Sequence, residues 1–127
     1  MRNTLSDRDG IAQTIDLYFA GMYQSKAEDI EASFHPNATI TGFRGDTGEL
    51  VEMDCGEFRN FAASQPPPAE NGEPFEMTLD SVDIKGKVAM VRVTDRYLNK
   101  RFTDLMLLLK TDDGWRIYSK LWHAEPL

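Results

Sequence analysis

The opening residues carry apolar side chains every three or four positions, which is the spacing of an amphipathic helix. Ser6 is a typical helix cap followed by acidic residues, so the pattern predicts a helix over residues 7–24. Ser25 can cap a second helix over residues 27–34. Pro36 ends it, because the residue before a proline is pushed out of the α region. The apolar positions of the two helices are Ile11, Ile15, Tyr18, Phe19, Met22, Ile30 and Phe34.

A short hairpin and a third helix are predicted next. Residues 39–43 are rich in β-branched side chains, a Gly-Asp-Thr-Gly turn follows, and residues 50–53 can return as the second strand. Asp54 can cap a helix over residues 55–64. Residues 65–72 include three consecutive prolines and predict an exposed loop.

The rest of the chain is predicted to form strands. Apolar runs and turn residues divide it into strands over 75–84, 88–97, 102–110 and 115–123. Three helical segments followed by a mostly antiparallel sheet form an α+β pattern. A chain of 127 residues is long enough to bury a core of its own, so we expect one domain over residues 1–127.

The last two predicted strands carry apolar side chains on both faces. In a sheet with one solvent-exposed face, apolar and polar side chains should alternate along each strand. One face can pack on the helices, but no helix remains to cover the other. This pattern predicts a homodimer that forms through the outer face of the sheet. The alternative is a monomer in which that apolar face remains exposed. In the strand over 102–110, alternation puts Phe102, Asp104, Met106 and Leu108 on one face and Thr103, Leu105, Leu107 and Leu109 on the other. In the last strand, one face carries Arg116, Tyr118, Lys120 and Trp122, and the other carries Trp115, Ile117, Ser119 and Leu121.

Composition narrows the classes of partner. The chain is 41% hydrophobic and 10% aromatic, as globular domains are, and its formal net charge of -7 argues against a nucleic acid or an anionic membrane surface as partner. The single cysteine excludes an intramolecular disulfide. The first residues lack the apolar core of a signal peptide, and no apolar run reaches the ~20 residues of a membrane span. We therefore expect a soluble cytoplasmic protein.

Three motifs resemble the nuclear-transport-factor-2-like superfamily: Phe-His-Pro-Asn-Ala at 34–38, Phe-Thr-Asp at 102–104, and Gly-Trp-Arg-Ile at 114–117 followed by Lys120. The similarity covers nearly the whole chain and is strongest to small bacterial proteins of the SnoaL-like and "putative lumazine-binding" branches. It implies a cystatin-like, cone-shaped barrel in which the three N-terminal helical segments pack in a curved, mostly antiparallel sheet. The superfamily includes isomerases, dehydratases, cyclases, epoxide hydrolases and simple binding modules, so the fold does not decide the function.

Ketosteroid isomerase, a member of that superfamily, offers a comparison for the chemistry. Its mechanism needs a base and two donors that hold an oxyanion. By the resemblance, Tyr18 falls at the oxyanion tyrosine and Asp104 near the second donor, a neutral carboxylic acid. The position of the general base falls on Gly42, which has no side chain to take a proton. The mechanism of the isomerase therefore cannot be transferred to this chain, even if the two proteins share the pocket.

Asp104 and Tyr18 each have a functional and a structural interpretation. Asp104 begins an otherwise apolar strand, and a buried carboxylate is costly unless it is protonated or paired. Lys120 is the candidate partner if the last two strands pair antiparallel, which would make a structural ion pair. Tyr18 either donates a hydrogen bond to a ligand or is a core aromatic whose hydroxyl finds a partner.

Two further residues are candidate proton carriers. Asp95 shares a face with the apolar positions of its strand and is the best substitute base in an enzyme, although we expect it to be solvated near the wide end of the cone. His35 at a helix end could be an acid or base, or could simply cap or pack. With two histidines and no metal-ligand spacing, we predict no metal and no cofactor. The predicted pocket wall, which suits a small, flat, mostly apolar molecule, contains Met22, Phe43, Tyr97, Met106, Lys120 and Trp122.

Three functions are consistent with this pattern. The first is a binding protein for a small aromatic or polycyclic metabolite. The second is a cofactor-independent isomerase, dehydratase or cyclase, in which Tyr18 and Asp104 polarise the substrate and Asp95 or His35 moves the proton. The third is a structural dimerisation module whose interior is filled.

Overall fold

Local capping signals set the ends of two of the three helices in the computed structural model, which describes residues 6–127. The Ser6 side chain accepts a hydrogen bond from the backbone of Asp9 at the start of α1, and Asp54 and Glu57 form a reciprocal capping box at the start of α3. Both helices have the bounds predicted from the sequence. The elements are α1 (Asp7–Gln24), α2 (Ala27–Ser33), β1 (Phe34–Phe43), β2 (Leu50–Asp54), α3 (Cys55–Ser64), β3 (Met77–Lys85), β4 (Val88–Tyr97), β5 (Lys100–Thr111) and β6 (Gly114–Pro126).

The second helix is shorter than predicted. It ends at Ser33, and Phe34 already belongs to β1, so Pro36 lies inside a strand rather than after a helix. A proline has no N–H for the ladder, and the pairing of β1 with β6 is shifted between Phe34 and Thr39. The strand therefore accommodates the proline at an irregularity.

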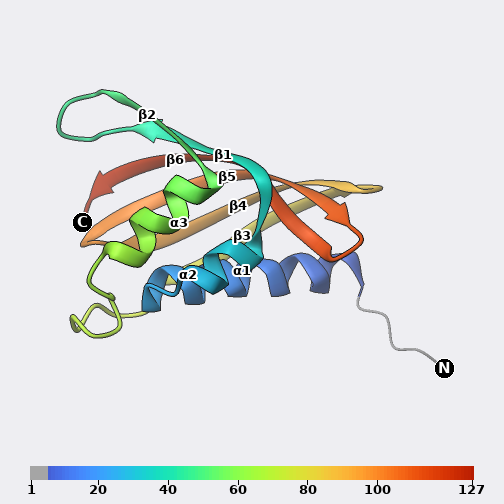
Figure 1. The fold of residues 1–127 in the computed structure, drawn as a ribbon, viewed down its shortest axis with the longest axis horizontal. Helices are drawn as coiled ribbons and strands as arrows, with labels where there is room; N and C mark the ends of the chain where they lie inside the picture. Colours follow the sequence, from blue (N-terminus) through green and yellow to red (C-terminus); the bar gives the residue numbers. More distant parts are fainter. Residues whose placement is uncertain (1–5) are drawn as a thin grey trace.

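The strands form one open six-stranded sheet in the order β2-β1-β6-β5-β4-β3. Every neighbouring pair is antiparallel except β1 and β6, which are parallel. The sheet is curved, and the three helices lie on the same side of it (Figure 1). This arrangement confirms the predicted α+β class. Within residues 6–127, no helix is long and apolar enough to span a membrane.

A β-bulge in β6 corrects the predicted faces of the last strand. The register with β5 changes between Leu107 and Leu108, and an extra residue at Tyr118 breaks the alternation. As a result Trp115 and Ile117 are buried before the bulge, while Lys120 is buried after it. One inserted residue exchanges the two faces of a strand. Strict alternation along the whole of β6, as predicted from the sequence, is therefore wrong, because the buried positions change from odd to even residue numbers at the bulge.

Candidate functional site

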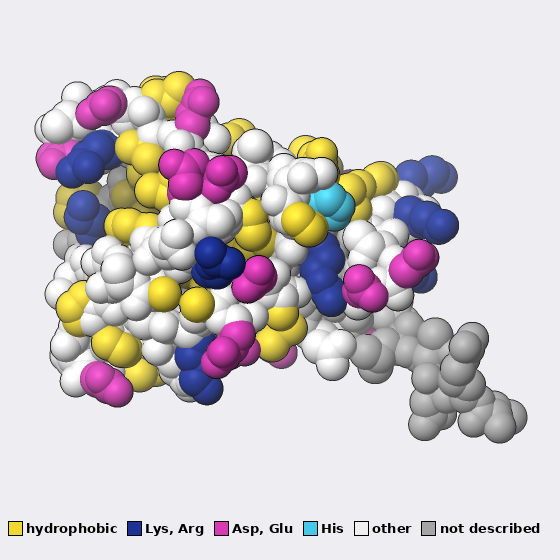
Figure 2. All heavy atoms as spheres, viewed as in Figure 1, with side chains coloured by type: hydrophobic (Ala, Val, Ile, Leu, Met, Phe, Trp, Pro, Cys, Tyr) yellow, Lys and Arg dark blue, Asp and Glu magenta, His cyan; other side chains and the backbone are white. Residues whose placement is uncertain are grey.

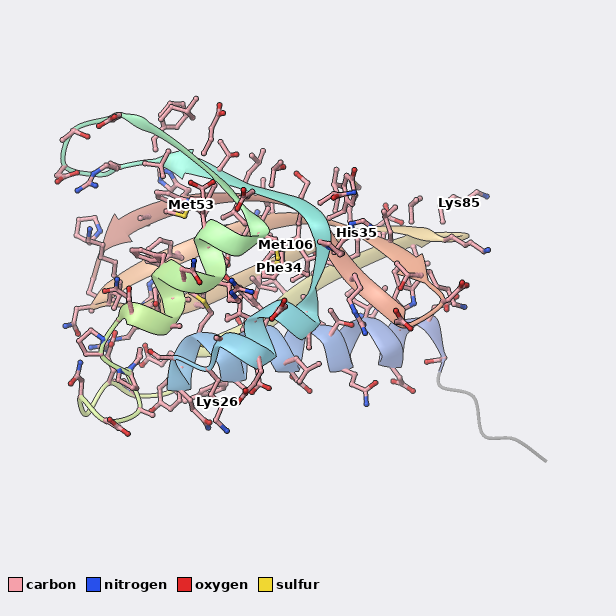
Figure 3. All side chains as sticks on the ribbon, viewed as in Figure 1. Lys26, Phe34, His35, Met53, Lys85 and Met106 are labelled. Atoms are coloured by element: carbon pink, nitrogen blue, oxygen red, sulfur yellow. The ribbon has the colours of Figure 1, made fainter. Side chains whose placement is uncertain are left out.

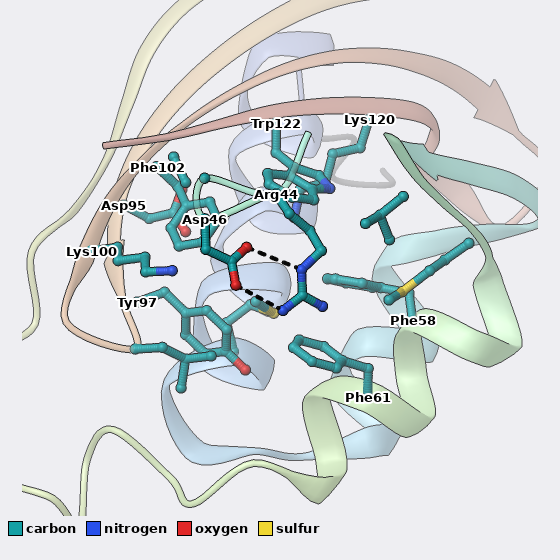
Figure 4. A pocket seen from close by; sticks show the side chains of 16 residues that line it. Arg44, Asp46, Phe58, Phe61, Asp95, Tyr97, Lys100, Phe102, Lys120 and Trp122 are labelled. Atoms are coloured by element: carbon teal, nitrogen blue, oxygen red, sulfur yellow. Dashed lines mark hydrogen bonds and ion pairs between the residues drawn. The ribbon is translucent and has the colours of Figure 1, made fainter. Parts of the chain in front are cut away.

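A cavity of about 250 Å³ lies at one end of the sheet, where α3 and the turns after β1 and β4 come together. The space-filling view shows hydrophobic side chains around a hollow at this end, with basic side chains at its rim (Figure 2). Figure 4 shows the side chains that surround it. They are Met22, Arg44, Asp46, Val51, Met53, Phe58, Phe61, Asp95, Tyr97, Leu98, Lys100, Phe102, Lys120, Trp122 and Ala124, with Gly45 contributing backbone.

Three buried polar side chains from α1, β5 and β6 form a continuous hydrogen-bonded chain behind the cavity wall. The Lys120 ammonium donates to the Tyr18 hydroxyl at 2.6 Å, and that hydroxyl donates to the Asp104 carboxylate at 2.8 Å. The Lys120 Nζ and the nearer Asp104 oxygen are 3.9 Å apart. Tyr18 therefore bridges an ion pair whose charged atoms are not in direct hydrogen-bond contact. Burial, together with the negative charge of Asp104, raises the pKa of the Tyr18 phenol well above its usual value.

Aromatic rings surround the buried ammonium. Its Nζ lies 4.5 Å from the centroid of the Phe58 ring and 4.8 Å from that of Tyr18, within the range of cation–π attraction. Lys120 also lines the cavity, whereas Tyr18 and Asp104 do not. Lys120 is therefore the member of the chain that a ligand can reach.

Asp95 is buried at the cavity wall and is not solvated, which corrects the sequence-based expectation. The cross-strand partner of Asp104 is Val93, two residues from Asp95, so the two carboxyl groups are diagonal neighbours on one face. Burial raises the pKa of Asp95 well above its usual range, Asp104 raises it further, and Lys120 opposes the shift. A proton on Asp95 leaves Lys120 and Asp104 as a neutral pair.

Polar atoms without partners concentrate at this wall. Among residues 6–127, Oδ1 of Asp95, Oδ1 of Asp104 and the Tyr97 hydroxyl are buried and lack a hydrogen-bond partner. Burial and the charge of Asp95 raise the pKa of Tyr97, so its phenol is a neutral donor. An unpartnered buried polar group is costly, and a bound molecule that satisfied one would recover that cost.

The glycine at the isomerase base position lies under a tryptophan. A Cβ built at Gly42 would overlap the indole ring of Trp122, its cross-strand neighbour on β6. That indole also packs against Phe102, with ring centroids 5.8 Å apart. The space that a base would need at this position is occupied by part of the cavity wall.

Comparison with known proteins gives the family. The family model described as "Putative lumazine-binding" matches residues 6–123. The chain belongs to this family. The fold is that of the NTF2-like (nuclear-transport-factor-2-like) superfamily, as the resemblance predicted.

Similar solved structures carry the same label. An NTF2-like protein of unknown function from Methylobacillus flagellatus KT is 30% identical, with a TM-score of 0.83 over 98% of this chain and 96% of that one. One from Shewanella baltica OS155 is 24% identical, with a TM-score of 0.84 over 98% and 100%. A relative named Aldolase FrzH, from Cladobotryum sp, is 25% identical over 126 residues, which cover 97% of this chain and 95% of the relative.

The fold of this NTF2-like protein brings only some of the predicted site residues to the cavity. Asp95 and four predicted wall residues line it, while Met106 is fully buried between the sheet and the helices (Figure 3). Tyr18 and Asp104 lie behind Lys120, as the hydrogen bonds above show. The four wall residues are Met22, Tyr97, Lys120 and Trp122.

Phe43 and His35 lie elsewhere, which corrects their predicted place in the pocket. Phe43 is 64% exposed, because alternation along β1 turns it outward when Gly42 faces Trp122. His35 packs its ring 5.1 Å from that of Tyr118 and accepts a hydrogen bond from the backbone of Asn37. Neither residue lines the cavity.

The residues at the mouth of the cavity were not predicted from the sequence. Arg44 and Asp46, from the turn after β1, form an exposed ion pair at 3.2 Å, and Lys100 stands at the turn after β4. Phe58 and Phe61, three residues apart on α3, also line the cavity. No local pattern indicates that these turns and this helix meet. Within residues 6–127, no three His, Cys, Asp or Glu side chains are grouped as a metal site.

Proposed function

We propose that this protein binds a small, mostly apolar molecule that carries one polar group. The observation that carries the proposal is the buried Tyr97 hydroxyl without a hydrogen-bond partner, beside Asp95 and Lys120 in a cavity whose other walls are mostly apolar. The apolar body of the ligand would fill the space between Phe58, Phe102 and Trp122. Its polar group would meet Asp95, Tyr97 or Lys120.

The size of the cavity supports a ligand with one or two rings. An enclosed space of about 150 Å³ accepts benzene, and this cavity has about 250 Å³. The description of the family names lumazine, a small-molecule ligand, which also supports this class of function. A large polycyclic metabolite would require the mouth at Arg44 and Lys100 to open.

Binding is tested by titrating lumazine and 1-indanone into the protein and following tryptophan fluorescence and the melting temperature. Trp122 lines the cavity, so a ligand there should change its emission in a saturable manner. A ligand at 100 times its dissociation constant stabilises the folded state by about 2.7 kcal/mol. The variant Asp95→Asn should weaken binding, whereas Asp112→Asn, in the exposed turn between β5 and β6, should not. No saturable change with either compound would contradict the proposal.

A second candidate is an enzyme that moves protons next to a carbonyl group. Two observations favour it: the raised pKa of the cavity-lining Asp95, and the similarity to a relative named as an aldolase. A buried carboxyl group in a cavity can give a proton to a bound carbonyl compound as the acid and take one as the carboxylate. Incubation with 1-indanone in D₂O should then exchange the α protons, measured by proton NMR, and Asp95→Asn should abolish the excess over the buffer rate. Equal rates with and without protein would reject this candidate.

The outer face of the sheet supports the proposed homodimer. Leu105, Leu107 and Leu121 are each about half exposed, at 52%, 53% and 53%. Asp83 and Arg92 flank the same shallow groove, so a twofold axis could place the arginine of one copy near the aspartate of the other. A second copy of this chain is therefore the occupant we propose for this face.

A further inference from the structure

Lys120 differs from every other lysine of the chain. It is 3% exposed in the cavity wall, whereas the other five are exposed, including Lys100 at the mouth of the cavity. Figure 4 shows its side chain entering the cavity beside Trp122. We propose that Lys120 is a nucleophile that forms an imine with a small aldehyde or ketone bound in the cavity. The proposal rests on the cavity being a ligand site, and it adds the chemical class of the ligand.

The buried hydrogen-bond chain offers a way to discharge the ammonium. An amine is nucleophilic only as the neutral base. Lys120 donates to the Tyr18 oxygen at 2.6 Å, and Tyr18 donates to Asp104 at 2.8 Å. When Tyr18 accepts the proton of Lys120 it passes its own proton to Asp104. The result is a neutral amine and a neutral carboxylic acid, with Tyr18 unchanged, and no unpaired charge is buried.

The nitrogen of Lys120 makes few hydrogen bonds. Within the described part of the chain, the Tyr18 hydroxyl is its single hydrogen-bond partner. The neighbouring Phe58 and Tyr18 rings offer π faces rather than acceptors. After the relay the Tyr18 hydroxyl donates to the neutral amine. The nitrogen must therefore turn from Tyr18 toward the cavity, about its Cε–Nζ bond, before its lone pair meets a carbonyl carbon.

Asp95 supplies the proton that the reaction needs. The amine nitrogen bonds to the carbonyl carbon, the C=O π electrons move to oxygen, and an N–H proton follows to give a carbinolamine. The carbinolamine oxygen then takes the proton of Asp95 and leaves as water, while the nitrogen lone pair forms the C=N bond. The products are a protonated imine, one water and the Asp95 carboxylate, so atoms and charge balance. That carboxylate is left beside the iminium as its counterion.

The cavity defines the carbonyl compound. Its walls are mostly aromatic and aliphatic side chains, and its volume is about 250 Å³. An aromatic aldehyde or a one- or two-ring ketone satisfies both limits. Exclusion of bulk water from the buried wall favours the imine over hydrolysis.

The experiment is reductive trapping. Folded protein is incubated with benzaldehyde and sodium cyanoborohydride near neutral pH, and the modified lysines are mapped by peptide mass spectrometry. We expect one benzyl group on Lys120, added at least roughly tenfold faster than at any exposed lysine because the cavity positions the aldehyde. Lys120→Arg should lose the fast addition, and Lys85→Arg, at the tip of the β3–β4 hairpin, should keep it (Figure 3).

A second measurement separates this inference from the binding proposal. Benzyl alcohol has the same ring but cannot form an imine, so its effect on the melting temperature of the unmodified protein reports binding alone. A rise in melting temperature with no preferred labelling of Lys120 would overturn the imine and leave the binding site standing. Neither a rise nor labelling would overturn both. Tyr18→Phe should slow trapping while leaving the benzyl alcohol shift in place, which a purely structural role would not produce.

Discussion

The indole of Trp122 lies across Gly42, and the two residues are neighbours on the parallel strands β1 and β6. A side chain at position 42 and the indole cannot occupy the same space. The contact turns Phe43 outward and places Trp122 in the cavity wall. It also explains in structural terms why this chain has no base at the position where the isomerase resemblance would place one.

Gly42→Ala should lower the free energy of unfolding by about 1–3 kcal/mol, the usual cost of overpacking. Urea denaturation measures the change. Gly56→Ala is the control, because a Cβ there would meet only the Asp54 side chain at 3.5 Å. The double variant Gly42→Ala, Trp122→Leu should recover part of the loss. A neutral Gly42→Ala would show that the indole is easily displaced.

Tyr18→Phe should destabilise the fold by about 2–3 kcal/mol, because two hydrogen bonds to charged groups lose their shared hydroxyl inside the protein. Tyr23→Phe is the matched control. Its hydroxyl donates one bond to a backbone oxygen of Glu73 at 2.6 Å, so its loss should cost about 1 kcal/mol. Equal losses in the two variants would contradict a special role for the Lys120–Tyr18–Asp104 chain.

The raised pKa of Asp95 predicts how stability depends on pH. An acid whose pKa is higher in the folded than in the unfolded state stabilises the fold fully below the unfolded pKa. That contribution disappears as the pH rises toward the folded pKa. From about pH 4 upward, Asp95→Asn should therefore gain stability relative to the wild type, by at most about 1.4 kcal/mol per pH unit. Urea denaturation across this pH range gives the difference, with Asp112→Asn, in the exposed turn between β5 and β6, as the surface control. A difference that does not change with pH would refute the shift.

Leu107→Glu should convert the proposed homodimer to a monomer, because a carboxylate would be buried in an apolar interface. Sedimentation velocity measures the change. Leu127→Glu, an exposed apolar residue at the end of the chain, should leave the assembly intact. A wild type that sediments as a monomer would exclude the dimer directly.

Local patterns were enough for the elements themselves. The starts of α1 and α3 follow from Ser6 and Asp54, whose side chains accept hydrogen bonds from the backbone three residues later. The succession of strands along the chain follows from turn residues and alternation, whereas their order in the sheet, with β1 beside β6, was not predicted. The end of α2 was predicted one residue too late, because Pro36 is compatible with both a helix stop and an irregular strand.

The Lys120–Tyr18–Asp104 chain and the neighbouring Asp95 were only partly predictable from the sequence. An aspartate in an apolar strand must find a partner, and the antiparallel pairing of β5 and β6 made Lys120 the candidate. That Tyr18 stands between them depends on how α1 crosses the sheet, which no local pattern encodes. Asp95 was expected in water and is buried, because its environment is set by the turn after β1 and by α3, far away in the sequence.

The fold class, the family resemblance and the need to neutralise a buried carboxylate can be predicted from the chain alone, because they depend on hydrophobic spacing, short motifs and the cost of burying a charge. Which residues meet at the cavity follows only from the folded arrangement. One bulged residue in β6 brings Lys120 inward, and the Gly42–Trp122 contact sends Phe43 out. Such decisions arise from contacts between distant segments, where a shift of one residue exchanges the two faces of a strand.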